Sequence, residues 1–409
     1  MILVLISPRQ AGLPFAQWLS EDKGQLVAVT ADGVTLGDGF AEVVTVADYS
    51  DDAAVLSAAR DAAQRHAPRA VLALAEVDVV RAARLRHEFG WPGLDSFAAT
   101  AYRDKVIMKK YARAAGIRVP EFAPAACVGD IEDFMARHPG RSVVKPRAGS
   151  GSSGVYVLDT PAQAADLAEA VSAEPYQVEQ FVDGVLHHVD AIRVDRIPVA
   201  AIASRYTGQG CLEHWTDAAF GSQTVDTADP VVEELVYETW RLVNALPSPR
   251  TIAVHAEFFV TPTGTIVLCE VAARIGGGPI PTMLRHVLGV DPRELWSRVE
   301  CGLPTDLPAV RERVRTAPHA AFYGVPPRKG RVSQLPDPPS GAVDFTLNTF
   351  VGDEWSDDRY AQRKSADFLA SWVVTDTDTA ALQAKLNSTA ASVSAGFAWE
   401  DAGSFSGAR

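Results

Sequence analysis

The sequence predicts an α/β protein in three parts: a parallel sheet at the N-terminus, a strand-rich α+β region in the middle and a mixed α/β lobe at the C-terminal end. Over residues 1–99, short apolar runs alternate with Ala-rich amphipathic stretches, which is the pattern of βαβ units. From residue 142 the pattern changes to closely spaced strands that include two hairpins. With 409 residues and a hydrophobic content of 47%, the chain is long enough for two or three domains around a large core.

Charge and apolar patterning exclude several classes of partner. Lys and Arg total 38 against 51 for Asp and Glu, giving a net charge of −13, so we expect no nucleic-acid surface. No run approaches the roughly 20 apolar residues of a membrane span, and the opening MILVLIS lacks a basic leader, so we expect no membrane partner. The 4 cysteines form no CxxC pair, which argues against a disulfide framework or thiolate metal site and favours the cytoplasm.

The first 99 residues predict a small Rossmann-like sheet. Its strands are expected at Ile2–Ile6, Leu26–Thr30 and Ala70–Leu74, with a helix within Ala53–Gln64. The first strand is followed by SPRQAG and not by a GxGxxG loop, so a dinucleotide site is not supported here. We expect this region to supply one wall of a cleft.

A helix is predicted next, over about residues 100–116, and it ends at Gly116. Its predicted buried stripe consists of Ile107, Tyr111, Ala114 and Ala115. Lys105 lies off this stripe and is free to serve a site. Further strands are predicted at Tyr176–Val182, His188–Val194 and Pro198–Tyr206, followed by a helix over residues 231–245.

The segment VVKPRAGSGSSGVYVL, residues 143–158, places Lys145 on an apolar strand and follows it with a loop of little except Gly and Ser. Successive backbone N–H groups in such a loop form a concave nest that suits phosphate oxygens. Lys145 supplies the positive charge that a polyphosphate requires. A flexible surface hairpin with a solvated lysine is the alternative. The loop is not a Walker A motif, because no Gly-Lys-Ser/Thr opens a helix here.

Two carboxylates, Glu257 and Glu270, lie in otherwise apolar strands of a second hairpin. A buried carboxylate needs a cation or a donor, so both acids predict a positive partner. An even-membered turn around Pro262–Thr263 places both side chains on one face of the ladder, where they suit Mg²⁺. A three-residue turn with a bulge at Gly264 would instead split them between the two faces and weaken the site.

Four segments, in this order, resemble the ATP-grasp superfamily: DKVIMKKYARAAGIRVP, VVKPRAGSGSSGV, VEQFVDG, and HAEFFV followed by CEVAARIGGG. The sequence is most similar to the carboxylate-amine ligase branch that includes the L-amino acid ligases (dipeptide synthetases), which carry a similar E-x-x-x-R-x-G-G-G. The resemblance implies an ATP-grasp fold with an N-terminal domain over 1–99, an ATP-grasp domain over 100–302 and a C-terminal lobe over 303–409. A lid subdomain is implied at about 118–183.

The same resemblance implies ATP and Mg²⁺ as cofactors, with Mn²⁺ as an alternative ion. It implies that Lys105 and Lys145 contact ATP phosphates, that Glu257 and Glu270 hold the metal, and that Lys145 and Arg274 are catalytic. Arg274 is expected to face the transferred phosphate or the reacting carboxylate. The other implied ATP-binding residues are Ser150, Gly151, Ser152, Ser153 and Gly154 in the lid loop, Glu179, Gln180, Phe181 and Val182 at the adenine-binding strand edge, and His187 near the ribose.

Substrate contacts are implied at five positions: His255, Arg274, Gly276, Gly277 and Trp215. For His255 the alternative is a hydrogen-bonded core residue, and for Trp215 it is a surface loop. Two positions depart from the family pattern. Ala272 stands where many members have a metal-binding Asn, and the segment GVLHHVD lacks the usual ribose-binding Glu, so His187 or none performs that role.

The expected activity is ATP-dependent ligation of a carboxylate to an amine through an acyl phosphate, with ADP and phosphate as the other products. Small carboxylate and amine substrates, above all amino acids, are the expected partners, and a homodimer is a compatible assembly. One alternative is a carboxylase or purine-pathway type of ATP-grasp enzyme that uses bicarbonate or formate. The other is a nucleotide-binding module without catalysis.

Overall fold

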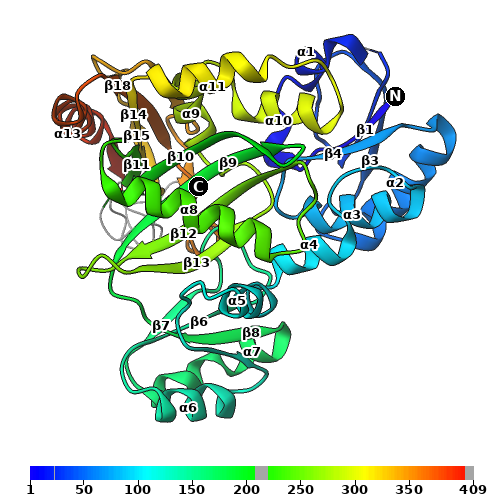
Figure 1. Ribbon diagram of the computed structural model, residues 1–409. Helices are drawn as coiled ribbons and strands as arrows, with labels where there is room; N and C mark the ends of the chain where they lie inside the picture. Colours follow the sequence, from blue (N-terminus) through cyan, green and yellow to red (C-terminus); the bar gives the residue numbers. More distant parts are fainter. Residues whose placement is uncertain (23, 208–219, 401–409) are drawn as a thin grey trace, which may run out of the picture.

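A computed structural model of the chain describes residues 1–22, 24–207 and 220–400. These residues form four β-sheets with helices packed around them (Figure 1). In Figure 1 the N-terminal sheet is blue, a small sheet with its own helices lies at the bottom, and the largest sheet crosses the centre toward the C-terminal region. Within the described part of the chain, no helix combines the length and apolar character needed to cross a membrane.

The N-terminal sheet is parallel, as predicted, with strand order β3-β2-β1-β4. Three strands match the predicted ones, and β3 is additional: it lies at the sheet edge, where alternate residues remain exposed. The elements are β1 (Ile2–Leu5), α1 (Phe15–Trp18), β2 (Leu26–Ala31), β3 (Phe40–Val46), α2 (Asp52–His66), β4 (Ala70–Ala73) and α3 (Asp78–Phe89).

The predicted helix over residues 100–116 is in fact two helices, α4 (Ser96–Arg103) and α5 (Lys105–Ala114). Asp104 separates them and caps α5, because its carboxylate accepts hydrogen bonds from the amides of Val106 and Ile107. The predicted stripe is also wrong. The buried residues of α5 are Lys105, Val106, Met108, Lys109 and Ala112. Two of them are lysines with carboxylate partners in other elements, which an apolar pattern cannot reveal.

The small sheet is antiparallel, with order β5-β8-β6-β7 and a separate hydrophobic cluster of its own. β6 and β7 pair as the predicted hairpin around the glycine loop, and β8 covers the other side of β6. The elements are β5 (Phe122–Ala125), α6 (Val128–Arg137), β6 (Ser142–Pro146), β7 (Tyr156–Leu158), α7 (Ala168–Ala173) and β8 (Tyr176–Gln180).

The largest sheet has eight strands in the order β13-β12-β9-β10-β11-β14-β18-β16. Three of these strands come from residues after 303, so the middle and C-terminal regions share one sheet. Its strands are β9 (Val185–Val194), β10 (Ile197–Tyr206), β11 (Phe220–Thr224), β12 (Ile252–Val260), β13 (Ile266–Ala272), β14 (His319–Val325), β16 (Asp344–Leu347) and β18 (Ala370–Asp376). The third small sheet contains β17 (Glu354–Trp355), β15 (Gly330–Gln334) and β19 (Ala398–Glu400).

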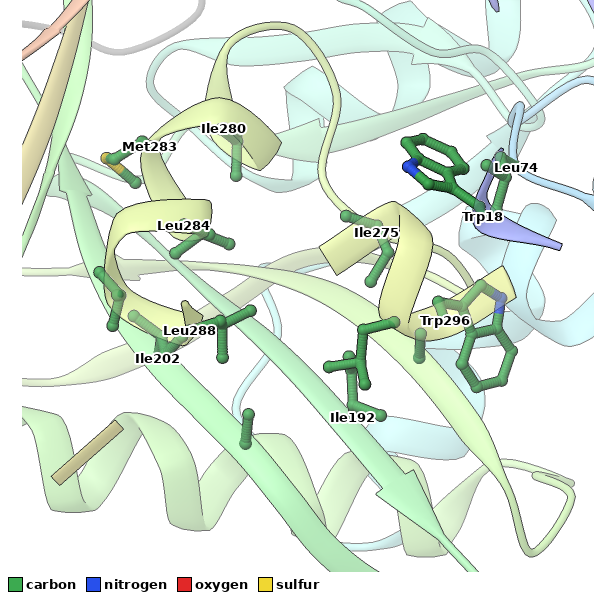
Figure 2. Close-up of a cluster of buried hydrophobic side chains, with 14 of the residues drawn as sticks. Trp18, Leu74, Ile192, Ile202, Ile275, Ile280, Met283, Leu284, Leu288 and Trp296 are labelled. Atoms are coloured by element: carbon green, nitrogen blue, oxygen red, sulfur yellow. The ribbon is translucent and has the colours of Figure 1, made fainter. Parts of the chain in front are cut away.

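Helices cover this sheet and connect it to the N-terminal region. They are α8 (Pro230–Ala245), α9 (Ile280–Leu288), α10 (Pro292–Glu300), α11 (Leu307–Thr316), α12 (Asp357–Ala361) and α13 (Thr379–Gly396). Figure 2 shows the α9 side chains Ile280, Met283, Leu284 and Leu288 packed over β9 and β10. Trp18 and Leu74 of the N-terminal region lie on the side of Ile275 and Trp296. Ile275 belongs to the same buried cluster. The apolar packing therefore fixes the turn that precedes α9.

Candidate active site

A cavity of about 1770 Å³ lies between the small sheet, the largest sheet, the N-terminal sheet and the C-terminal region. Residues from the carboxyl ends of the N-terminal strands line one wall, as predicted for this region. The predicted site residues that line the cavity are Lys105, Lys145, Ser150, Gly151, Ser152, Ser153, Glu179, Gln180, Phe181, Val182, His187, His255, Glu257, Glu270, Arg274, Gly276 and Gly277. Gly154 is not among the lining residues, and Trp215 lies outside the described residues.

Gly154 has a structural reason to be glycine. Its φ is +67°, and a Cβ there would lie 2.7 Å from the hydroxyl of Tyr176 and 3.0 Å from Cγ of Pro146. Gly154 therefore allows the glycine loop to return to β7 in close contact with its own sheet. The phosphate contact expected of it remains a prediction.

Lys145 and Glu179 form a buried ion pair on the face of the small sheet that borders the cavity. The Nζ atom of Lys145 lies 2.7 Å from Oε1 of Glu179, and Nζ of Lys109 lies 2.5 Å from Oε2. Burial alone would lower the pKa of Lys145, but attraction to Glu179 outweighs it, so the pKa is raised. Burial lowers the pKa of Lys109 below the usual lysine value. The sequence analysis missed Lys109, because nothing in the helix pattern marks it as a site residue.

Lys105 links the glycine loop to the second hairpin. Its Nζ donates to the carbonyl of Gly149 at 2.9 Å and lies 3.2 Å from Oε2 of Glu270. Burial would raise the pKa of Glu270, but Lys105 and Lys145 lower it to about 2, so this acid is a carboxylate at neutral pH. The glycine loop and lysines expected to bind phosphate and the two carboxylates expected to bind metal therefore meet at one end of the cavity.

Glu257 and Glu270 lie directly opposite each other in the β12–β13 ladder, on one face. The predicted even-membered turn is wrong, however. The amide of Thr261 donates to the carbonyl of Thr265, which leaves a three-residue loop that ends at Gly264 with φ +78°. A β-bulge at Cys269 then shifts the register by one residue and restores the pairing of the two acids.

Arg274 is held from another part of the fold. Its Nε lies 2.5 Å from Oε2 of Glu76, which follows β4 in the N-terminal region. Arg103 binds the other carboxylate oxygen of Glu76 at 2.6 Å and also donates to the carbonyl of Ala148 beside the glycine loop. Burial would raise the pKa of Glu76, but the two arginines lower it. The sequence analysis missed Glu76, which connects Arg274 to the loop.

A third missed residue, Asp190, organises the part of the cavity around His255 and Gly276, where substrate contacts are expected. Its Oδ1 accepts from the amide of Gly276 and from Nδ1 of His255, both at 3.0 Å. Its Oδ2 lies 2.7 Å from Nδ1 of His188, whose Nε2 contacts Ser222. Burial would lower the pKa of His255, but Asp190 and Glu257 raise it to about 10. His255 is thus an imidazolium beside a proposed metal ligand.

The described residues contain one His/Asp cluster with metal-like spacing, formed by His188, Asp190 and His255. Its ligand atoms already bond to one another at 2.7–3.0 Å, and Asp190 also accepts from a backbone amide. These distances are those of hydrogen bonds between the imidazole nitrogens and the Asp190 carboxylate, so the three residues form a hydrogen-bond network and do not fit a metal site. Glu257 and Glu270, which border the cavity, fit Mg²⁺ better.

Two adenine-side expectations need qualification. The main chain of Glu179 is paired within the sheet between β5 and β6, and the amides of Gln180 and Phe181 donate to the carbonyls of Glu121 and Arg141. The adenine hydrogen bonds expected along this strand edge therefore remain a prediction. The carboxylate of Glu179 forms its ion pair with Lys145, and both residues line the cavity. His187 borders the cavity, but strand alternation places it on the face opposite His188 and Glu257. Its Nδ1 contacts the carbonyl of Val185, and the ribose role remains a prediction.

Solved structures resemble this chain over nearly its whole length. The crystal structure of an L-amino acid ligase from Bacillus licheniformis superimposes with a TM-score of 0.79 at 16% identity, covering 98% of both chains. The chain has the ATP-grasp fold. The α/β fold class and the ATP-grasp fold predicted from the sequence are therefore confirmed.

Two other solved structures are also similar. A carboxyaminoimidazole ribonucleotide synthase from Aspergillus clavatus, complexed with ATP, gives a TM-score of 0.72 at 13% identity and covers 97% of this chain and 98% of its own. A further match is the biotin carboxylase domain of the Hydrogenobacter thermophilus 2-oxoglutarate carboxylase, in complex with MgADP and bicarbonate. It gives a TM-score of 0.70 at 14% identity and covers 98% of this chain and 90% of its own. At these identities the likeness shows the fold alone.

Curated sequences give two partial matches. An L-arginine-specific L-amino acid ligase of Bacillus subtilis is 24% identical over 248 residues, which is 55% of each protein. The uncharacterized protein y4rH of Sinorhizobium fredii is 26% identical over 231 residues, 54% of this chain and 46% of that protein. The matched part thus spans about half the length of these relatives. No family model matches the chain.

Proposed function

We propose that this protein is an ATP-dependent ligase that joins a carboxylate to an amine through an acyl phosphate and releases ADP and phosphate. One observation carries the proposal: the opposed pair Glu257 and Glu270 faces Lys105, Lys145 and the glycine loop across a single cavity. This set combines hard oxygen ligands with cations and the backbone amides of the glycine loop. Such a combination suits a metal-bound polyphosphate and has no evident purpose in a purely structural cavity.

The chain's own residues account for nucleotide binding in this proposal. Lys105, Lys145 and the amides of Ser150–Gly154 would hold the phosphates, and the strand edge after Glu179 would receive the adenine. Glu257 and Glu270 would hold Mg²⁺, which supplies positive charge at the phosphoryl group when bound. Because Ala272 stands where many ATP-grasp enzymes have a metal-binding Asn, the protein supplies two carboxylates. Nucleotide and water oxygens would complete the coordination shell of the ion.

Transfer of the phosphoryl group would depend on positioning and charge. A substrate carboxylate attacks the terminal phosphorus of ATP, the bond between that phosphorus and ADP breaks, and the acyl phosphate forms. Arg274, fixed by Glu76, is directed to orient the carboxylate, because its guanidinium can bind two oxygens at once. The amine then attacks the carbonyl carbon, phosphate leaves with the bridging oxygen, and the amine loses a proton. A closed glycine loop excludes water during both steps.

Amino acids are the substrates that we propose. This assignment is supported by the likeness to two proteins named L-amino acid ligases, one by fold and one by partial sequence. His255, the buried Gly276 and the exposed Gly277 border the side of the cavity where we propose that the substrate binds, and a small polar substrate would find donors and acceptors there. Trp215, expected to contribute to side-chain selectivity, lies outside the described residues.

The test is a phosphate-release screen over pairs of amino acids, with mass spectrometry of the products. For an active pair, ¹⁸O in the substrate carboxylate should place one label in the released phosphate, and ADP should form in equal amount. AMP and pyrophosphate would contradict the acyl phosphate route. Release that depends on bicarbonate would favour a carboxylase, and nucleotide binding without release under any condition would favour a binding module.

A further inference from the structure

Lys109 is a charged side chain placed where no ligand can reach it. It is fully buried on α5, and it is not among the described residues that line the cavity. A buried ammonium group is costly unless it is paired, so its position calls for an electrostatic reason. Its partner is Glu179, whose Oε2 lies 2.5 Å from the lysine Nζ.

Glu179 serves two lysines and not one. Its Oε1 lies 2.7 Å from Nζ of Lys145. Its Oε2 binds Lys109 and also accepts a hydrogen bond from the side-chain Nε2 of Gln177 at 2.7 Å. Two lysines and one carboxylate leave one net positive charge. If Lys109 were absent, the carboxylate would cancel the charge of Lys145, and no net charge would remain to attract a phosphate.

We propose that Lys109 is a positioning residue for the nucleotide: it neutralises Glu179, so that Lys145 keeps an uncompensated charge for phosphate. This inference rests on the proposed function, because it takes Lys145 to be a phosphate ligand. The two lysines have different positions and therefore different proposed roles. Lys145 borders the cavity and meets the ligand, whereas Lys109 reaches Glu179 from the opposite, buried side.

A merely structural role for Lys109 would weaken folding but would not distinguish ligands by their phosphates. The discriminating quantity is therefore the ratio of the dissociation constant for adenosine to that for ADP. Both constants are measured by calorimetry on the full chain with Mg²⁺ present. Lys109→Met should lower this ratio about tenfold or more, because it removes the net charge that only the phosphates feel. Lys110→Met is the matched control: Lys110 is the next residue on α5 and is exposed.

The double variant Lys109→Met with Glu179→Gln has the same net charge as the wild type at this site. It should recover the wild-type ratio to within about threefold, since the charge on Lys145 is again uncompensated. Lys109→Arg should also retain it. An unchanged ratio in folded Lys109→Met, or no recovery in the double variant, would overturn the proposal.

Two further outcomes keep the test decisive. If Lys109→Met does not fold, Glu179→Gln alone decides: it leaves both lysines uncompensated, so its ratio must be at least that of the wild type, and a lower ratio overturns the inference. If the wild-type protein binds neither ADP nor adenosine, the nucleotide site itself is wrong, and the proposed function fails together with the inference. Wild-type binding of ADP with an unaltered ratio in folded Lys109→Met refutes the inference alone.

Discussion

Gly276 occupies a position in which a side chain does not fit. Its amide donates to Oδ1 of Asp190 at 3.0 Å, and a Cβ would lie 2.7 Å from that same oxygen and 3.0 Å from Nδ1 of His255. The neighbouring Gly277 has nothing within 4 Å of its Cβ position. Glycine at 276 is therefore required by close packing against the Asp190 network, whereas glycine at 277 leaves open space next to the cavity.

Gly276→Ala should lower kcat/KM for the ligation about 100-fold, because displacing Asp190 and His255 by a few tenths of an ångström or more misplaces the substrate side of the site. Gly37→Ala is the control and should change kcat/KM less than about fivefold, because Gly37 has open space at its Cβ position and does not line the cavity. Steady-state kinetics with an active amino acid pair measures both. Equal losses in the two variants would contradict the role given to Asp190.

At the scale of the element, the β12–β13 hairpin places its acids by two compensating irregularities. A three-residue loop alone would pair Glu257 with Cys269 and direct Glu270 to the other face. The bulge at Cys269 adds one residue to β13, and Glu270 takes the opposing position. The bulge is therefore the feature that brings the two carboxylates to one face.

Deletion of Cys269 should leave the two acids opposed, because the shortened β13 then pairs with β12 in a regular ladder and every later pair keeps its partner. We expect Mg²⁺-dependent turnover within about tenfold of the Cys269→Ala control. A magnesium titration of ATP-dependent phosphate release measures this. Complete loss in a folded deletion variant, with the Ala control active, would show that the bulge does more than set the register.

At the scale of the whole molecule, two buried glutamates form ion pairs that join the N-terminal region to the rest of the protein. Glu76 binds Arg274 at the cavity, and Glu300 at the end of α10 binds Arg86 of α3 at 2.5 Å. The two glutamates are similarly buried, with side chains 12% and 10% exposed. Only the first pair includes a predicted site residue, so the two provide a matched comparison between function and stability.

Glu76→Gln should lower kcat/KM about 100-fold, because Arg274 and Arg103 lose the charge that orients them, while ADP affinity changes little. Glu300→Gln should instead lower the free energy of unfolding by about 2 kcal/mol and leave the activity of the folded protein unchanged. Urea unfolding and steady-state kinetics separate the two effects. A larger loss of activity in Glu300→Gln than in Glu76→Gln would contradict this assignment.

The sequence by itself determined the features that depend on local pattern. The apolar runs predicted the parallel sheet, the glycine loop and Lys145 predicted a phosphate nest, and the four ordered segments predicted the ATP-grasp fold. The sheet and the fold are confirmed, because strand period and motif order are properties of neighbouring residues, whereas the phosphate nest remains a prediction. Lys145, Glu257, Glu270 and Arg274 then came together at one cavity, although their roles remain predictions.

Only the tertiary structure decided which groups pair with these predicted site residues. Lys109 pairs with a carboxylate 70 residues away, and Arg274 with one 198 residues away. The register of the acids depends on a bulge that no local pattern marks. The physical reason is that a buried charge is tolerated only where folding brings it a partner, and such partners can be any distance apart in the chain.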